Sequence, residues 1–202
     1  MGEIRYERSF REIEKRRKAG TLSPVPILKA KGKAKGGFFA SKETEPYLAN
    51  GPVLGQSHPD SCVATACRML IFDLRPELQA DIRFSETYLR DFLETDEEGA
   101  LVRDIPAVLR EAGIESYEYR DNLTWRDLRK AVRLGRVIVR VSGPLPDDGH
   151  VLVIEQIVAG RLAVRDSLPQ NQGTSYWVSQ QDFRAAWRSK KTGYGKAVIR
   201  VK

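Results

Sequence analysis

The sequence predicts an α+β domain in which an N-terminal helix packs on an antiparallel β-sheet. Apolar residues recur at helical spacing in several segments between residues 61 and 134. From residue 137 onward, short apolar runs separated by turn residues are typical of strands. Two of these runs flank Ala159-Gly160 and predict a β-hairpin over residues 150–166. Helices followed by mostly antiparallel strands are the pattern of an α+β fold.

Four helices are expected in the first two thirds of the globular part. The first starts at Cys62, after Asp60 and Ser61, either of which can accept free N–H groups of the first turn. It runs to about Asp73. The second starts at residues 84–86, the third covers residues 104–113, and the fourth, residues 125–134, is capped by Thr124. The second helix is expected to bury four apolar side chains, namely Tyr88, Leu89, Phe92 and Leu93.

The expected strands lie mainly in the C-terminal half. One strand, residues 114–119, falls between helices. The others are residues 137–141, the two arms of the hairpin, residues 176–178 and residues 196–201. A last helix is expected to open at residues 179–182 and to carry Phe183 and Trp187.

The register of the hairpin decides which of its residues share a face. If Asp166 is to orient His150, both side chains must lie on the same face of the sheet. A two-residue turn would pair Asp166 with Val153, on the opposite face. A three-residue loop ending at Gly160 would pair Asp166 with Leu152, on the His150 face. Because such loops favour a left-handed last residue, glycine there predicts the three-residue loop.

The positive charge of the chain is concentrated in an N-terminal arm. The net charge is +7, from 34 Lys and Arg against 27 Asp and Glu in 202 residues. Residues 1–45 hold 12 of the basic and 6 of the acidic residues, so residues 46–202 are nearly neutral. Within the arm, residues 3–18 are expected to form an amphipathic helix, and residues 21–45 have the composition of a linker. The predicted domains are therefore 1–45 and 46–202. The arm suits either docking to an acidic partner or a solvated tail, and nucleic acid is disfavoured as a partner elsewhere.

Several classes of protein are disfavoured by composition. The two cysteines, Cys62 and Cys67, point to different faces of one helix and are not expected to form a disulfide. No CxxC or HxxxH spacing predicts a zinc site, and no cofactor is expected. No apolar run has the length of a membrane span, and the N-terminus lacks the apolar core of a signal peptide. The expected location is the cytoplasm, or a target cell reached without a cleaved signal.

Cys62 is the candidate nucleophile of a thiol hydrolase. At the start of a helix, free N–H groups and the helix dipole stabilise a thiolate. Gln56, on the loop leading into the helix, could donate a hydrogen bond and complete an oxyanion hole with the Cys62 N–H. His150 opens an apolar strand and suits a general base, and Asp166 on the following strand could orient its ring.

Other residues compete for these parts. His58 lies four residues before Cys62 and is a rival base, but no neighbouring residue is suited to orient it. Asp147 and Asp148 are weaker alternatives to Asp166. Cys67, deeper in the helix, is expected to be a small buried apolar residue.

The order Gln56, Cys62 on a helix, His150 and Asp166 on successive strands resembles the papain-like cysteine peptidases. The similarity is strongest to their bacterial branch, the C39-type peptidases and papain-fold toxins, and covers about residues 50–200. The chain departs from the usual C39 pattern at Val63, where glycine is usual, and at Ser167, where proline is usual. The resemblance implies a papain-like fold, a Cys-His-Asp triad, a protein or peptide substrate, and a possible inhibitor or immunity protein as partner.

The residues leave the reaction open. Peptide-bond cleavage, after Gly-Gly by analogy with C39-type relatives or on target-cell proteins by analogy with the toxins, is the first hypothesis. Glutamine deamidation or transglutamination on the same triad is the second, and a degenerate binding module the third. Gly36-Gly37 in the arm suggests either self-cleavage after Gly37 or an arm held in the cleft as inhibitor, the alternative being a plain linker.

Overall fold

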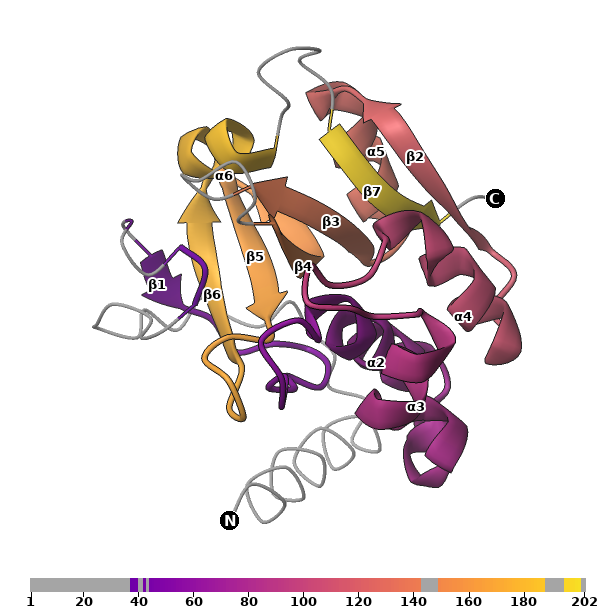
Figure 1. Cartoon of the computed structure of the whole chain (residues 1–202). Coiled ribbons are helices and arrows are strands. Elements are labelled where there is room, and N and C mark those ends of the chain that lie inside the picture. The colour runs from indigo at the N-terminus through magenta and orange to yellow at the C-terminus, as the bar shows by residue number, and fades with distance from the viewer. Residues whose placement is uncertain (1–36, 40–41, 43, 143–148, 188–194, 201–202) are drawn as a thin grey trace, which may run out of the picture.

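The computed structural model describes residues 37–39, 42, 44–142, 149–187 and 195–200 (Figure 1). The helix expected at residues 3–18 lies outside these ranges, as do Asp147 and Asp148. None of the helices within them has both the length and the apolar character needed to cross a membrane.

A single antiparallel sheet forms the centre of the molecule (Figure 1). Its seven strands lie in the order β1-β6-β5-β4-β3-β7-β2, and every neighbouring pair is antiparallel. The strands are β1 Thr44–Pro46, β2 Tyr117–Leu123, β3 Val137–Ser142, β4 Gly149–Val158, β5 Arg161–Asp166, β6 Thr174–Ser179 and β7 Gly195–Arg200. The predicted α+β class is confirmed.

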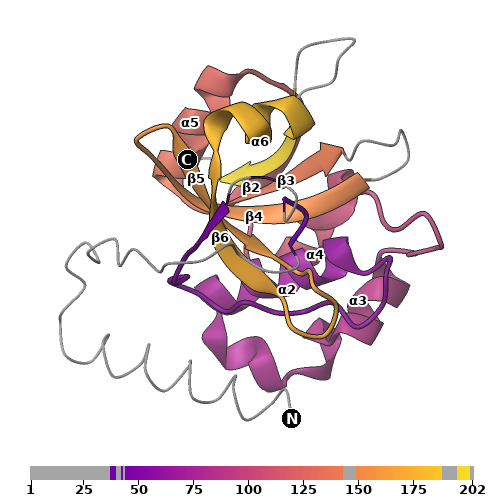
Figure 2. The same cartoon turned by 90° about the vertical axis from the view of Figure 1, so that its left-hand side faces the viewer.

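Helices cover both faces of the sheet, and Figure 2 shows the two layers above and below the strands. The α-helices are α2 Cys62–Leu74, α3 Glu86–Phe92, α4 Ile105–Glu111, α5 Trp125–Leu134 and α6 Gln180–Trp187. Strand β4 shows the division: Val151 and Val153 join the core under α2, α3 and α4, whereas Leu152 and Ile154 join the core under α5 and α6. This alternation is what a strand covered on both faces requires.

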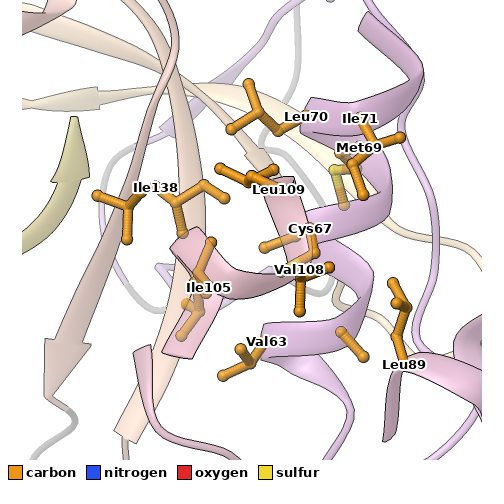
Figure 3. Close-up of a cluster of buried hydrophobic side chains, with 14 of the residues drawn as sticks. Val63, Cys67, Met69, Leu70, Ile71, Leu89, Ile105, Val108, Leu109 and Ile138 are labelled. Carbon is orange, nitrogen blue, oxygen red and sulfur yellow. The ribbon is translucent and has the colours of Figure 1, made fainter. Parts of the chain in front are cut away.

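Helix α2 is the buried centre of the first layer. Ten of its thirteen residues are buried, so the helix is covered nearly all round. Figure 3 shows its side chains, Val63 and Cys67 among them, packed against Ile105, Val108 and Leu109 of α4. Cys67 is fully buried there, as predicted.

Helix α3 buries less than the sequence predicted. Leu89 and the following Leu93 are buried, but Tyr88 is 44% exposed and Phe92 39% exposed. Residues four apart form a stripe along a helix, and only the Leu89/Leu93 stripe faces the core. The prediction that all four side chains are buried was therefore wrong for Tyr88 and Phe92.

The packed domain starts earlier in the chain than residue 46. Strand β1 pairs with β6 and forms one edge of the sheet, so the predicted boundary falls inside a strand. Phe39 is 3% exposed and contacts the rings of Tyr176 and Phe183. Part of the expected linker, residues 37–39 and 44–45, thus belongs to the folded domain.

The turn between β4 and β5 differs from the predicted one. Val158 pairs with Arg161, which leaves a two-residue turn at Ala159-Gly160 with φ values of 49° and 74°. Two left-handed residues in succession are typical of a type I′ turn. The predicted three-residue loop was wrong.

A bulge in β4 nevertheless restores the predicted register. The ladder shifts by one residue between Ile154 and Gln156, and Glu155 is the extra residue. Beyond the bulge, Leu152 pairs with Asp166, so Asp166 does lie on the His150 face. The predicted pairing was correct, although a bulge and not the loop length produces it.

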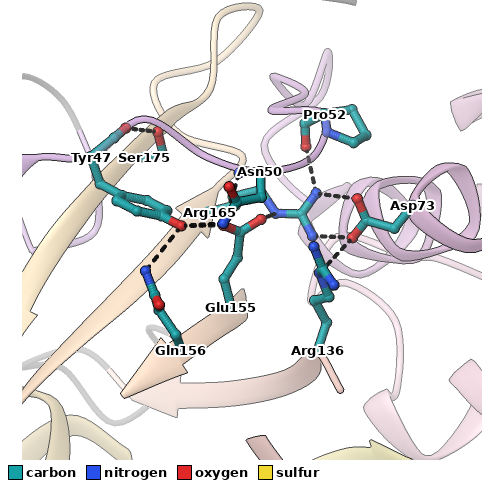
Figure 4. Close-up of polar contacts among 9 residues, drawn as sticks. All are labelled: Tyr47, Asn50, Pro52, Asp73, Arg136, Glu155, Gln156, Arg165 and Ser175. Atoms are coloured by element: carbon teal, nitrogen blue, oxygen red, sulfur yellow. Dashed lines mark hydrogen bonds and ion pairs between the residues drawn. The ribbon is translucent and has the colours of Figure 1, made fainter. Parts of the chain in front are cut away.

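The bulged Glu155 belongs to a buried polar cluster around Arg165 (Figure 4). Arg165 is fully buried, and its guanidinium lies between the carboxylates of Glu155 and Asp73. It also donates to the carbonyl oxygen of Pro52 at 2.8 Å. This cluster joins β4, β5 and the end of α2, the three elements that carry the candidate site.

Candidate active site

Cys62 is the first residue of α2 and is 9% exposed. The expected side-chain cap is absent, because Ser61 makes no capping hydrogen bond. Its hydroxyl instead accepts a hydrogen bond from Arg90 at 2.7 Å, and Arg90 also pairs with Asp60, Nη2 to Oδ2 at 2.9 Å. The Ser61 hydroxyl therefore does not accept a hydrogen bond from the N–H groups of the first turn. These N–H groups lie at the Cys62 end of the helix.

His150 joins Cys62 to Asp166. Its side chain is almost completely buried, and Nε2 lies 2.7 Å from Oδ1 of Asp166. Cys62 is its other polar neighbour, and the interaction with Cys62 raises the pKa of the ring. Because Asp166 engages Nε2, the other nitrogen, Nδ1, is the one that can face the sulfur. Residues from α2, β4 and β5 thus meet in one row, Cys62, His150 and Asp166.

The row favours a charged imidazole. Burial by itself lowers the pKa of His150, but the interactions with Asp166 and Cys62 outweigh burial and raise the pKa to about 10. His150 is then protonated at neutral pH. Asp166 and Cys62 are thus the two neighbours that favour the charged form of the ring.

The carboxylate of Asp166 is fully buried and accepts four hydrogen bonds. Oδ1 accepts from His150 and from the backbone N–H of Leu168 at 2.9 Å. Oδ2 accepts from the hydroxyl of Tyr176 and from the backbone N–H of Phe38, both at 2.7 Å. Burial and the charge of Asp166 together raise the pKa of Tyr176. With both oxygens engaged on two sides, the carboxylate has one orientation, which suits it to hold an imidazole.

Gln56 is buried close to the site, but its amide donors point to the backbone. Nε2 donates to the carbonyl oxygens of His58 at 2.8 Å and Pro59 at 2.7 Å, and Oε1 accepts from Ser167 at 2.6 Å. Because two carbonyl oxygens lie beside one end of the Gln56 amide, that end must carry the nitrogen, which is a donor. Gln56 therefore links the loop before Cys62 to the residue after Asp166, and its part in an oxyanion hole stays a prediction.

The structure distinguishes His150 from the rival base. His58 is exposed on the loop before α2, whereas His150 is buried, contacts Asp166 at 2.7 Å and interacts with Cys62. Cys67 is fully buried, and burial raises the pKa of its thiol. Within the described ranges no group of three or more His, Cys, Asp and Glu is placed to hold a metal ion.

Sequence reasoning missed three contributors to the site. Phe38 donates its N–H to Asp166, and its ring stacks on His150 with centroids 5.5 Å apart and planes at 10°. Tyr176 was noted only as part of a strand, and Ser167 only as a departure from a family pattern. The Gly-Gly-Phe-Phe sequence was the available signal for Phe38, but its position in a lysine-rich arm suggested a linker.

Comparison with known proteins gives matches among solved structures alone. No protein-family model matches the sequence, and no curated protein matches it. A C39-like peptidase from Bacillus anthracis superposes with a TM-score of 0.56 at 14% identity, over 80% of this chain and 98% of that one. The peptidase domain of Streptococcus ComA, a bifunctional ABC transporter involved in quorum sensing, gives 0.53 at 18% identity, over 74% and 98% of the two chains.

A third similar structure is a double glycine motif protease from an AMS/PCAT transporter in complex with its leader peptide. It has a TM-score of 0.53 at 13% identity and covers 74% of this chain and 89% of that chain. All three matches extend over most of both chains, and at these identities they define the fold. The chain has the papain-like fold of the C39-type peptidases.

Proposed function

We propose that this chain is a cysteine peptidase in which Cys62 is the nucleophile, His150 the general acid and base, and Asp166 the residue that orients His150. The observation that carries the proposal is the row of Cys62, the buried imidazole of His150 and the buried carboxylate of Asp166, in which Nε2 lies 2.7 Å from the carboxylate and Cys62 is the other neighbour that interacts with the ring. A nucleophile, a base within hydrogen-bond reach and a third group holding the base form a catalytic unit for acyl transfer. The papain-like fold supports the same reading.

The first half of the reaction is acylation of Cys62. The thiolate attacks the carbonyl carbon of the substrate, a C–S bond forms, and the carbonyl electron pair moves to oxygen. The resulting oxyanion accepts a hydrogen bond from the Cys62 backbone N–H at the start of α2. When the intermediate collapses, the C–N bond breaks and the leaving nitrogen takes the proton from Nδ1 of His150.

The second half is hydrolysis of the thioester. Neutral His150 now accepts a proton from water, whose oxygen attacks the acyl carbon. Collapse of the second intermediate breaks the C–S bond, releases the carboxylic acid and leaves thiolate and imidazolium. Asp166 keeps Nε2 engaged through both halves and stabilises the charged ring.

Gln56 is proposed as the second oxyanion donor. In the structure both amide hydrogens are directed to the carbonyls of His58 and Pro59. Donation to substrate therefore requires that one of these two hydrogen bonds be exchanged when the oxyanion forms. Gln56→Glu removes both donors at nearly constant size, and loss of kcat without loss of folding would support this assignment.

The proposed substrate is a polypeptide, and Gly-Gly before the scissile bond is the proposed preference. Its support is the similarity to a protease that acts on a double glycine motif and binds a leader peptide. The proposed setting, an effector acting on proteins of a target cell and opposed by an inhibitor protein, rests on the sequence resemblance to papain-fold toxins.

The deciding experiment compares wild type with Cys62→Ala on a whole proteome. New protein N-termini that appear with wild type and are absent with Cys62→Ala would establish a peptidase and reveal the residues around the cut. Cys67→Ala, the matched control in the same helix, should give the wild-type pattern. Mass changes at intact glutamine residues with no new N-termini would contradict the peptidase and favour deamidation or transglutamination.

A further inference from the structure

The described part of the chain begins with three residues, Gly37–Phe39, that lie against the catalytic row. We call this segment the N-terminal strap. Phe39 anchors it in the core between Tyr176 and Phe183, with ring centroids 6.5 Å and 6.4 Å away. Phe38 precedes this anchor and reaches the site itself. The strap belongs to the arm that the sequence separated from the catalytic domain.

The two backbone N–H groups after Gly37 are linked to one carboxylate oxygen, the first directly and the second through the hydroxyl of Tyr176. The N–H of Phe38 donates to Oδ2 of Asp166 at 2.7 Å. The N–H of Phe39 donates to the hydroxyl of Tyr176 at 3.4 Å, and that hydroxyl donates to the same Oδ2 at 2.7 Å. The strap therefore orients Asp166 directly and through Tyr176, on the side opposite His150.

The side chain of Phe38 covers the imidazole. Its ring is parallel to the ring of His150 within 10°, at a centroid distance of 5.5 Å. An aromatic face is attracted to a cation placed over it, and it excludes water from the ring that it covers. Water that reached the bond between His150 and Asp166 would compete for it and screen the charges.

Gly37 allows this close approach. A Cβ atom at this position would lie 2.5 Å from Cε1 of Tyr176 and 3.0 Å from both Oδ2 of Asp166 and Cγ2 of Thr174. Any larger residue must therefore push the strap away from the carboxylate or displace Tyr176. The glycine is required by contact with the site.

We propose that the N-terminal strap is a positioning element of the catalytic triad, in which the Phe38 N–H fixes the Asp166 carboxylate and the Phe38 ring shields the His150–Asp166 hydrogen bond from water. This inference rests on the proposed peptidase for its kinetic consequence, but the strap's effect on His150 can be measured without any substrate. It assigns Gly37 and Phe38 to the site as residues that act through Asp166 and His150.

The same geometry bears on the two hypotheses for Gly36-Gly37. The nitrogen of the Gly37–Phe38 bond is the atom that donates to Asp166. This bond thus lies at the carboxylate end of the row, beyond the imidazole from Cys62. Self-cleavage after Gly37 is not supported by this arrangement. Removing the contact of Phe38 should lower activity if the strap positions the triad, and should raise activity if the arm is an inhibitor.

The kinetic test uses the full chain with Phe38→Ala, Phe38→Leu and the control Phe92→Ala. Phe38→Ala should lower kcat about tenfold to a hundredfold with KM little changed, since a displaced base acts on the chemical step. Phe38→Leu keeps an apolar cover and should retain most activity. Phe92, 39% exposed on α3, should be replaceable without effect. Higher activity in Phe38→Ala would establish an inhibitory arm, and equal activity would also overturn the proposal.

The second test follows the proton on His150 by NMR. The chain has two histidines, so His58 serves as an internal reference. Phe38→Ala should lower the raised pKa of His150 toward its ordinary value near 6.5, because water weakens the bond to Asp166 that raises it, and should leave the NMR signals of His58 unchanged. Gly37→Ala should have the same effect on the pKa of His150, and it serves as the test variant if Phe38→Ala folds poorly. An unchanged His150 titration in folded Gly37→Ala and Phe38→Ala would reject the strap, whereas inactive wild type with the expected shifts would reject only the peptidase.

Discussion

Asp73 and Arg165 form a buried ion pair that connects the helix beginning at Cys62 to the strand ending at Asp166. Asp73 lies in the last turn of α2, which begins with Cys62, and Arg165 directly precedes Asp166 on β5. Their side chains are 5% and 0% exposed. The pair therefore fixes the distance between two elements that must stay in register for His150 to contact both partners.

Breaking this pair should destabilise the protein. Asp73→Ala leaves the Arg165 charge buried with only Glu155 as an acidic partner, and should lower the free energy of unfolding by about 3 kcal/mol. Urea denaturation measures this. Arg120→Ala breaks the exposed pair between Arg120 and Glu118 and should change stability little. Equal effects of the two substitutions would show that the buried ion pair stabilises the protein no more than an exposed one does.

The two cysteines should differ in reactivity and in effect on activity. Cys62→Ala should abolish cleavage while folding stays nearly intact, because the side chain lies at a helix end. Cys67→Ala should keep activity and cost about 1–2 kcal/mol of stability, because it removes a buried sulfur from the core. Alkylation at neutral pH followed by peptide mass mapping should modify Cys62 first. An essential Cys67 would contradict the assigned nucleophile.

His150→Ala should reduce kcat as much as Cys62→Ala does, because the two act as one unit, and the double variant should be no worse. Asp166→Asn should cost less, since the amide oxygen can still accept from His150. It should nevertheless cost something, because the new NH₂ group would face the Phe38 N–H, which is also a donor. Steady-state kinetics of the three variants decides this. A fully active Asp166→Asn would indicate that the carboxylate charge is unimportant.

Stability should depend on the protonation of His150. Its folded pKa of about 10 lies above the ordinary value of 6.5. A raised pKa means that the stabilising contribution is fully present below pH 6.5 and is lost as pH rises through about 10. Thermal unfolding of wild type and His150→Asn from pH 6 to 10 should therefore show a difference that shrinks with rising pH. A constant difference would show that the imidazole is not charged in the folded state.

The predictable part of the site came from local patterns. The helix at Cys62 and the strand after His150 follow from periodicity. The face shared by His150 and Asp166 was predicted correctly, but from a loop length that the structure does not have. The bulge that produces this register could not be predicted, because Glu155 pairs with Arg165, and Arg165 with Asp73, only in the folded core. Side-chain partners distant in sequence are invisible to a local pattern.

The same limit explains the other differences. Asp60 or Ser61 was expected to cap α2, but both side chains accept hydrogen bonds from Arg90, a residue of α3. Phe38 looked like part of a linker because its neighbours in sequence are lysine and glycine, whereas its neighbours in space are His150 and Asp166. The composition of a segment says little about which side chains the fold brings to it.

Strand β1 also determines how the molecule meets other molecules. It is three residues long, ends in Pro46, and covers the edge of β6, a six-residue strand that contains Tyr176, Trp177 and Val178. A short edge strand with a proline offers few free N–H groups for pairing with another chain. A recombinant form starting at residue 46 would lose this cover and present a longer, aromatic edge. Such a form should aggregate through strand pairing, which would show that β1 protects this edge of the sheet, while Gly37–Phe39 contact the candidate site.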